Sequence, residues 1–232
     1  MKIYCLTNEN HYWLLPPFLE LFRQFWPHGR LEIVGYTPPA FSSGAPFHSI
    51  AQKNYPAGKW TTGLIEFLHS IEDEYFILML EDYWLTAPVP GSLAMLCNAV
   101  KSGYFGPKFL RLDLTADRAA HPYRVHERVA GYEIISTASH TPYQMSFQAG
   151  IWHRQNLLKV LVPDETPWQA EINGSKRMRG AAWLVLGTRQ RPLSYTPVWR
   201  GNQGRANLDG LPEQQRTYLL REIIQKREGV HA

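Results

Sequence analysis

Short apolar runs alternate with helix-spaced apolar residues along the first half of the chain. Three continuous runs are typical of buried strands: residues 3–6, 31–36 and 75–80. Between them, apolar residues recur at helical spacing, first after Pro16-Pro17 and again over residues 60–71. Strands that alternate with helices usually pair in parallel through right-handed crossovers. The pattern therefore predicts an α/β fold with a mostly parallel central sheet.

The second half of the chain predicts further elements of both kinds. Helical spacing occupies residues 90–102, 154–162, 168–179 and 212–226. Strand-like segments occupy residues 109–114, 132–136 and 143–147, and for the last two an antiparallel pair is one option. Residues 37–58 are rich in Pro, Ser, Gly and Ala, which predicts a long loop of the kind that often carries function. No linker or repeat divides the chain, so we expect one domain, residues 1–232.

Polar residues follow the predicted parallel strands at the points where the strands end. Thr7-Asn8 follows the first strand, Tyr36 closes the second, and Glu81-Asp82 follows the third. Parallel strands bring their carboxyl ends to one edge of the sheet, where α/β proteins bind ligands. The acidic pair is therefore a candidate binding site. A solvated acidic turn after a strand is the plainer interpretation of the same residues.

Composition indicates an ordinary globular protein with a mild preference for anionic partners. Hydrophobic residues make up 44% and charged residues 19% of the 232 positions, and the net charge of +4 favours an anion such as a nucleotide diphosphate or nucleic acid. Cys5 and Cys97 have no metal-type spacing and predict no disulfide framework. The sequence carries no signal-peptide pattern and no apolar stretch of about 18 residues, so we expect no membrane span and a cytoplasmic protein, in a host cell if a phage encodes it.

Several separated segments together resemble the small GT-A type glycosyltransferases, in particular those like glycosyltransferase family 2. The segments are the strand ending in Thr7-Asn8, Trp60-Thr61-Thr62, the run from Phe76 to Leu85, the run from Met145 to Trp152, and Pro167-Trp168-Gln169-Ala170-Glu171. Their order and spacing match over roughly residues 1–180. The resemblance implies a Rossmann-like three-layer sandwich, with residues 1–115 binding a nucleotide-sugar and residues 116–232 binding an acceptor. It also implies transfer of the sugar, from UDP in our expectation, to a hydroxyl group.

The resemblance assigns the donor side to Thr7, Asn8, Tyr36, Lys59, Glu81, Asp82 and Arg200. Glu81-Asp82-Tyr83 stands where the family has an acidic D-x-D motif, which holds Mg²⁺ or Mn²⁺ against the diphosphate. Tyr83 is a poor ligand, so either Asp82 alone anchors the metal or the protein works without one. In the second case Lys59, Arg200 and Arg205 are candidates to neutralise the diphosphate. A solvated Gly-containing loop is an equally good interpretation of residues 200–205.

The acceptor side is assigned to Gln148, Trp152 and Trp168, with Glu171 as the catalytic base. Inverting transfer needs a carboxylate that takes the proton of the attacking hydroxyl. In the W-x-x-E sequence, Trp168 and Glu171 share one helix face, because residues three apart are neighbours. Plainer interpretations are that Glu171 complements the helix dipole and that Trp152 packs in the core. For Asp113, an ion pair with Arg111 or Arg118 is favoured over a substrate contact.

Two acceptor classes and one non-enzymatic function remain open from the sequence. The acceptor is either an envelope glycan or a hydroxymethylated pyrimidine in DNA, and the basic isoelectric point near 9.0 leans towards DNA. The alternative is a nucleic-acid- or carbohydrate-binding protein that has this fold but no turnover, for which the missing third acidic residue is the main support. The chain contains no Walker, G-x-S-x-G or Rossmann glycine motif, and its histidines lack zinc-ligand spacing.

Overall fold

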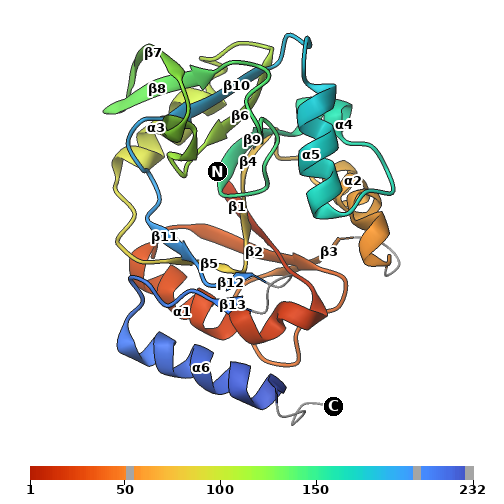
Figure 1. Ribbon diagram of the computed structural model, residues 1–232, viewed down its shortest axis with the longest axis vertical. Helices are drawn as coiled ribbons and strands as arrows, with labels where there is room; N and C mark the ends of the chain where they lie inside the picture. The colour runs from red at the N-terminus through yellow and green to blue at the C-terminus, as the bar shows by residue number, and fades with distance from the viewer. Residues whose placement is uncertain (51–54, 201–204, 228–232) are drawn as a thin grey trace.

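A computed structural model describes residues 1–50, 55–200 and 205–227 of the chain, and its centre is a nine-stranded sheet (Figure 1). The strand order is β3-β2-β1-β4-β9-β6-β10-β8-β7. The strands are β1 (Lys2–Leu6), β2 (Arg30–Gly35), β3 (Phe47–Ser49), β4 (Tyr75–Leu80), β6 (Phe109–Asp113), β7 (Tyr123–Val129), β8 (Tyr132–Thr137), β9 (Gly150–His153) and β10 (Leu184–Thr188). All of them run in one direction except β8 and β9. The predicted α/β class with a mostly parallel sheet is therefore confirmed.

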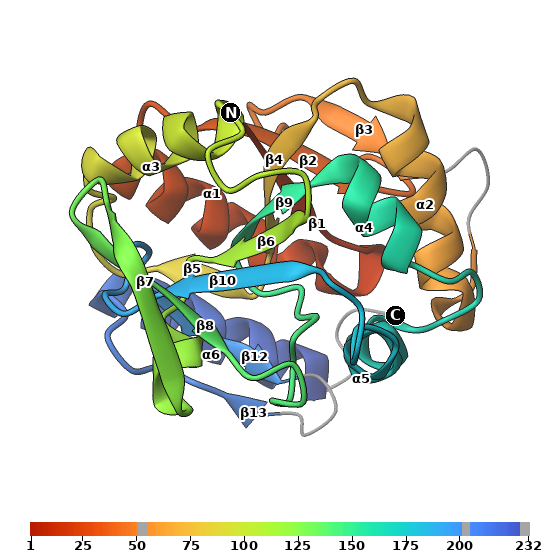
Figure 2. The same ribbon diagram turned by 90° about the horizontal axis from the view of Figure 1, so that it is seen from above.

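Helices cover both faces of this sheet, which gives three layers (Figure 2). On one face lie α1 (Leu15–Phe25) and α3 (Ser92–Lys101), and on the other lie α2 (Trp60–Ser70), α4 (Arg154–Val160) and α5 (Pro167–Arg177). Short 3₁₀ turns connect the elements at η1 (Glu9–Leu14), η2 (Ala57–Lys59) and η3 (Asp117–Ala120).

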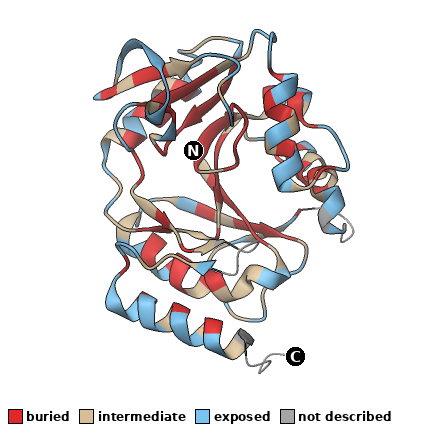
Figure 3. Cartoon of the chain, in the orientation of Figure 1, coloured by how far each residue is buried: buried red, intermediate tan, exposed pale blue. Residues whose placement is uncertain are grey.

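The alternation of side chains along β1 explains why the sheet has two apolar faces. Ile3 and Cys5 belong to the core under α1 and α3, whereas Tyr4 and Leu6 belong to the core under α2 and α4. Successive residues of a strand point to opposite faces, so a continuous apolar run must be covered on both sides. Figure 3 shows these central strands as the most buried part of the molecule.

The C-terminal part adds a smaller layer outside α1. Strand β5 (Tyr83–Leu85) pairs with β11 (Tyr195–Pro197), and β12 (Trp199–Arg200) pairs with β13 (Arg205–Ala206). Helix α6 (Glu213–Arg227) lies along α1, where Gln215 Nε2 donates a hydrogen bond of 3.0 Å to Glu20 Oε2. The Tyr218 hydroxyl donates one of 2.9 Å to the Trp13 carbonyl in η1. Among the residues that the structure describes, no helix is long and apolar enough to cross a membrane.

The early elements match the sequence prediction, but the strand predicted at residues 143–147 is wrong. That segment is an irregular loop, and the strand is β9, inserted antiparallel between β4 and β6. Two backbone N–H groups of the loop bond to side chains of α5 in place of a neighbouring strand: Met145 donates to Ser175 Oγ and Phe147 donates to Glu171 Oε1. Strand β8 pairs with β7, which the sequence analysis missed, and the predicted loop 37–58 contains β3.

Candidate functional site

A cavity of about 890 Å³ opens where β1, β4 and β6 end. Its walls come from segments far apart in sequence, including the turn after β4, the start of η3, the loop before β9 and the first turns of α5. Pockets of this size bind small ligands, and in open α/β sheets they lie at this edge.

The cavity brings together most of the predicted site residues. Those that line it are Thr7, Asn8, Glu81, Asp82, Gln148, Trp168 and Glu171. Three others lie elsewhere: Tyr36 packs against α2, Lys59 Nζ is 3.7 Å from Asp164 Oδ1, and Trp152 is fully buried with the Arg111 guanidinium 5.1 Å from its ring centre. The Arg200 side chain lies outside the described residues, as do residues 201–204.

Glu81 is tied to the N-terminal part of the chain. Its carboxylate is buried, and Oε1 lies 2.6 Å from Nδ1 of His11, a residue of η1. The Glu81 carbonyl accepts a hydrogen bond of 3.1 Å from the indole N–H of the buried Trp84. These contacts hold the turn that follows β4, so the orientation of the next residue, Asp82, is fixed.

Asp82 presents a carboxylate oxygen with no hydrogen-bond partner among the described residues. This atom, Oδ1, is buried, while the Asp82 carbonyl accepts a hydrogen bond of 2.7 Å from the Val198 N–H. Burial, reinforced by the neighbouring Glu81, raises the pKa of Asp82 to about 8. A buried carboxylate oxygen without a partner is costly, and a bound cation would relieve this cost.

Asp82 Oδ1 is also the atom on which binding of a divalent cation, Mg²⁺ or Mn²⁺, depends at this site. The described residues contain no group of three or more His, Cys, Asp or Glu side chains suited to a metal ion. Mg²⁺, however, is usually held by one or two carboxylates together with phosphate oxygens of the substrate. Asp82 therefore fits a cation that is shared with a diphosphate, and does not fit one held by the protein alone.

Glu171 lies one turn into α5, and the local sequence explains its position. Thr166 and Gln169 form a reciprocal capping box and Pro167 occupies the first helical position, so the helix begins at a fixed residue. Glu171 Oε1 accepts a hydrogen bond of 2.6 Å from the Phe147 N–H. Burial raises the pKa of Glu171, opposed by this bond, by the Ser146 hydroxyl and by the charge of Arg111. A carboxylate with a raised pKa beside a cavity suits general base chemistry.

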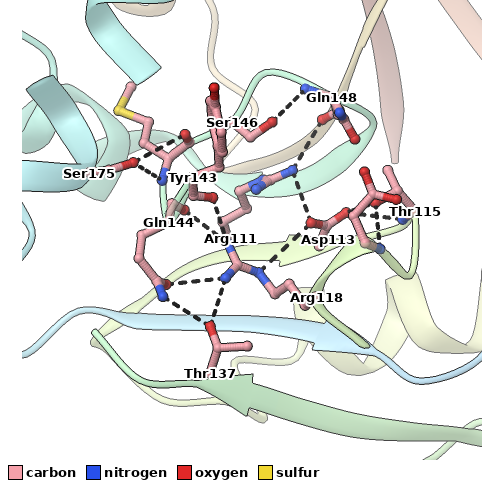
Figure 4. Close-up of polar contacts among 12 residues, drawn as sticks. Arg111, Asp113, Thr115, Arg118, Thr137, Tyr143, Gln144, Ser146, Gln148 and Ser175 are labelled. Carbon is pink, nitrogen blue, oxygen red and sulfur yellow. Dashed lines mark hydrogen bonds and ion pairs between the residues drawn. The ribbon is translucent and has the colours of Figure 1, made fainter. Parts of the chain in front are cut away.

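Asp113, at the end of β6, pairs with both nearby arginines, as the sequence analysis favoured. Its Oδ2 lies 3.5 Å from Arg111 and 3.8 Å from Arg118, and Figure 4 shows the three side chains converging. Burial, with the neighbouring charge of Arg111, lowers the pKa of Arg118 to about 10. Asp113 Oδ1 accepts bonds from the Thr115 N–H and hydroxyl, which shape the turn into η3. Asp113 is thus occupied by structural contacts.

Several residues of the cavity wall were not predicted as site residues from the sequence. They are His11, Asp117, Arg118, His121, Tyr143, Arg191 and Tyr195. His11 follows Asn8 by three residues, a spacing typical of one helical turn after a strand end, and this was an available signal. Arg118 and Tyr143 meet only through tertiary contacts, so no local pattern indicates them.

Comparisons with known proteins show the fold class. No family model and no curated protein matches the chain. A structure described as a mycobacterial protein matches with a TM-score of 0.50 and 10% identity, over 96% of this chain and 72% of that one. Residues 1–349 of S. aureus TarS match with a TM-score of 0.50 and 10% identity over 84% of this chain, which spans 59% of the TarS fragment. TarS is a GT-A-like glycosyltransferase, so the chain has a GT-A-type fold.

Proposed function

We propose that the protein is a glycosyltransferase that moves a sugar from a nucleotide-sugar to an acceptor hydroxyl with inversion at the anomeric carbon. The observation that carries the proposal is the convergence of Asp82 and Glu171 on one cavity, from the end of β4 and from α5. One carboxylate has an oxygen without a partner and the other is positioned by a backbone N–H and has a raised pKa. The GT-A-type fold supports the same activity.

The two carboxylates have different roles in the proposed reaction: Glu171 acts on the acceptor hydroxyl, and Asp82 lies on the donor side. The acceptor oxygen attacks the anomeric carbon while Glu171 takes its proton, and the bond between that carbon and the diphosphate oxygen breaks. The electron pair of this bond leaves with the nucleoside diphosphate, and the new glycosidic bond forms on the opposite face of the sugar. The buried surroundings that raise the pKa of Glu171 make it a stronger base than an exposed carboxylate.

The donor is proposed to occupy the β1 and β4 side of the cavity, within the half formed by residues 1–115. Thr7 and Asn8 lie beside the acidic pair there and offer hydroxyl and amide groups to a nucleoside, for which uridine is our expectation. Asp82 would hold Mg²⁺ or Mn²⁺ together with the diphosphate. Such a cation offsets the negative charge that develops on the leaving group. Tyr36 and Lys59 point to other neighbours and have no role in this proposal.

The acceptor is proposed to approach along α5 and the loop before β9, within the half formed by residues 116–232. Gln148 lies in this wall, and its Oε1 accepts a hydrogen bond of 3.1 Å from the Tyr195 hydroxyl. Trp168 is exposed one helical turn before Glu171 and offers a flat apolar face to a ring. Both an envelope glycan and a hydroxymethylated base in DNA contain a suitable hydroxyl on a ring-bearing unit.

Release of UDP from UDP-sugars tests the proposed activity. The purified protein is incubated with UDP-glucose, UDP-galactose and UDP-N-acetylglucosamine with and without Mn²⁺, and free UDP is measured. We expect slow release by water, reduced about 10²-fold or more by Glu171→Gln because the base is lost. Asp82→Asn should also abolish it, whereas Glu72→Gln, an exposed carboxylate just before β4, serves as the control.

A thermal-shift screen with the same nucleotides separates the enzyme from the non-catalytic alternative. A ligand that binds only the folded state raises the melting temperature. Stabilisation by UDP-sugars without any release of UDP would favour a binding protein. Neither stabilisation nor release with any nucleotide-sugar would count against the proposed donor site altogether.

A further inference from the structure

Two exposed aromatic side chains line the cavity on the acceptor side. Trp168 is 62% exposed and Tyr143 is 51% exposed, whereas the other described aromatic residues of the wall are at least partly buried. Exposed flat apolar rings in a cavity usually have a binding role, because water contact with them is unfavourable until a ligand covers them. Tyr143 has no part in the chemistry proposed above.

The contacts between α5 and the loop before β9 place these two rings on opposite sides of Glu171. Phe147 is bonded to Glu171, and Met145 is bonded to Ser175, so the loop passes along α5 in the reverse direction. Tyr143 precedes Met145 in this loop and therefore lies towards the level of Ser175, while Trp168 lies at the start of the helix. Trp168 and Ser175 are separated by about 10 Å along the axis at 1.5 Å per residue. That span exceeds a single sugar ring.

A buried arginine holds Tyr143 in an unusual backbone conformation. Its φ is 56°, in the left-handed region that favours glycine. Arg118 is 3% exposed, and its Nη2 donates to the carbonyls of Tyr143 and Gln144 at 3.1 and 3.0 Å. Nη1 donates to Thr137 Oγ1 at 3.1 Å, which fixes the guanidinium to β8. The aromatic ring is therefore presented at a position where glycine would be less strained, which indicates that the ring is used.

The charged residues on the acceptor side of the cavity, which is formed by α5, the loop before β9 and the neighbouring Asp117 and Arg191, favour a neutral ligand over a polyanion. Asp117 and Glu171 both face the cavity, and the positive charge of Arg118 is already directed at Asp113. Arg191 lines the same wall with its Nε donated to the Thr115 carbonyl at 3.2 Å. A nucleic-acid backbone would bring phosphates close to two carboxylates, whereas sugar hydroxyls can donate hydrogen bonds to them.

We propose that Tyr143 is a specificity-determining residue and forms a second acceptor platform, positioned by Arg118. A neutral oligosaccharide would stack one ring on Trp168 and a later ring on Tyr143, with the reacting hydroxyl between them at Glu171. The inference rests on the proposed glycosyltransferase function and adds to it the length and class of the acceptor. Arg118 acts through Tyr143 and contacts no substrate in this arrangement.

The test measures how binding depends on the length of the acceptor. Oligosaccharides of β-linked glucose, N-acetylglucosamine and mannose, from one to six units, are titrated calorimetrically into the protein in the presence of UDP and Mn²⁺. We expect at least one series to gain about tenfold in affinity once the chain is long enough to reach both rings, and then to level off. Tyr143→Asn and Trp168→Ala should each remove this gain, and Tyr143→Phe should keep it.

The variants are chosen so that misfolding does not imitate the expected result. Asn tolerates the left-handed backbone, and Trp168 is largely exposed, so neither change should lower the melting temperature. Tyr104→Asn alters another exposed tyrosine, away from the cavity, and should leave binding unchanged. Arg118→Lys is expected to be less stable, so its binding is measured at a temperature at which it remains folded. It should reduce the length-dependent gain while the single sugar binds as before, which a purely structural role of Arg118 would not produce.

Failure of this inference and failure of the proposed function give different results. Release of UDP from the donor without any dependence on acceptor length would overturn the second platform and leave the transferase intact. Tighter binding of a twelve-nucleotide DNA containing hydroxymethylcytosine than of every oligosaccharide would also overturn it. Length-dependent binding of an oligosaccharide without release of UDP would support the platform and point to the non-catalytic binding protein.

Discussion

The carboxylate of Glu171 accepts a hydrogen bond from the backbone N–H of Phe147 at 2.6 Å, which joins α5 to the loop before β9. This contact and the Ser146 hydroxyl orient the candidate base, and the hydrogen bond from Met145 to Ser175 adds to the attachment of the loop to α5. Because the N–H is a fixed donor, it stabilises the ionised form of the carboxylate while burial opposes it. Burial is the larger effect, and the pKa of Glu171 is raised.

The pH dependence of transfer should follow the ionisation of Glu171. A base must be unprotonated, so the rate is expected to fall as pH decreases through the raised pKa of this carboxyl group, above its ordinary value of 4.5. The measurement is kcat/KM for UDP release between pH 4 and 8. The residual rate of Glu171→Gln should lack this acidic limb and keep only the dependence near pH 8 that Asp82 contributes through metal binding. An identical limb in the variant would show that another group controls it.

Asp82→Asn should increase stability, and increasingly so as pH rises. The pKa of Asp82 is raised from 3.8 to about 8, so the folded state binds this proton more tightly than the unfolded state does. The wild-type protein therefore loses stability as pH rises across that window, by on the order of 1 kcal/mol per pH unit. Urea unfolding at pH 5 and pH 8 checks the difference. Asp209→Asn, at an exposed position, is the control and should change stability by less than about 0.5 kcal/mol.

Mn²⁺ with UDP should stabilise the wild-type protein more than UDP alone, and Asp82→Asn should remove this additional effect. The reason is that Asp82 Oδ1 has no other partner among the described residues. Protons compete with the metal for this oxygen, so the additional shift in melting temperature should grow between pH 6 and pH 8. Chelation with EDTA should reverse it. An equal effect of Mn²⁺ on the variant would exclude Asp82 as the ligand.

Gly174→Ala should destabilise the protein by about 1 to 3 kcal/mol, because a Cβ there would overlap the buried Met145 side chain. Met145 belongs to the loop before β9, along which the acceptor is proposed to bind, so the same substitution should also weaken acceptor binding. Gly91→Ala is the matched control, since nothing lies within 4 Å of a Cβ at that position. Thermal and urea unfolding measure both. Equal stability of the two variants would contradict the close packing of the loop on α5.

Arg118→Lys should cost about 3 kcal/mol in unfolding free energy. A lysine keeps the charge but cannot reproduce the forked donors that reach Thr137, Gln144 and the Tyr143 carbonyl. Arg128→Lys, on the exposed β7, should change stability by less than about 0.5 kcal/mol. Urea unfolding of the two variants compares them. A small effect at position 118 would indicate that the buried network is replaceable.

Local patterns were sufficient for the first half of the fold because its strands and helices follow one another and pair with near neighbours. The run from Tyr75 to Leu80 is a strand with acidic residues at its end, as the apolar pattern predicts. The second half failed where pairing is distant. Strand β9 inserts between β4 and β6, which are distant from it in sequence. Residues 143–147 have a strand-like pattern, but they bond to α5 and not to a strand, which the pattern does not reveal.

The site was predictable to the extent that strand ends and a helix start determine it. The position of Asp82 after an apolar strand indicated a binding site, whereas Glu171 was assigned through the resemblance to GT-A type glycosyltransferases, and both residues line the cavity. The positions of Lys59 and Trp152 outside the cavity could not be predicted, because neither spacing nor composition reveals an ion pair with Asp164 or a buried contact with Arg111. Tyr143 was not predicted as a site residue because its position depends on a hydrogen bond from Arg118, 25 residues earlier in the chain.

The reversed direction of β9 has a consequence for how this protein can be altered. The loops that follow the parallel strands β4 and β6 lie at the cavity and carry carboxylates. Because β9 is antiparallel to both, it is the loop before β9 that lies at the cavity, between those two loops. Residues 138–143, which precede the buried part of this loop, can therefore be exchanged as a cassette without changing the Glu81-Asp82 turn or the contacts of Met145 and Phe147 with α5. Loops of different length inserted at this point should change which acceptor binds while the donor side, formed by Thr7, Asn8 and the Glu81-Asp82 turn, stays the same.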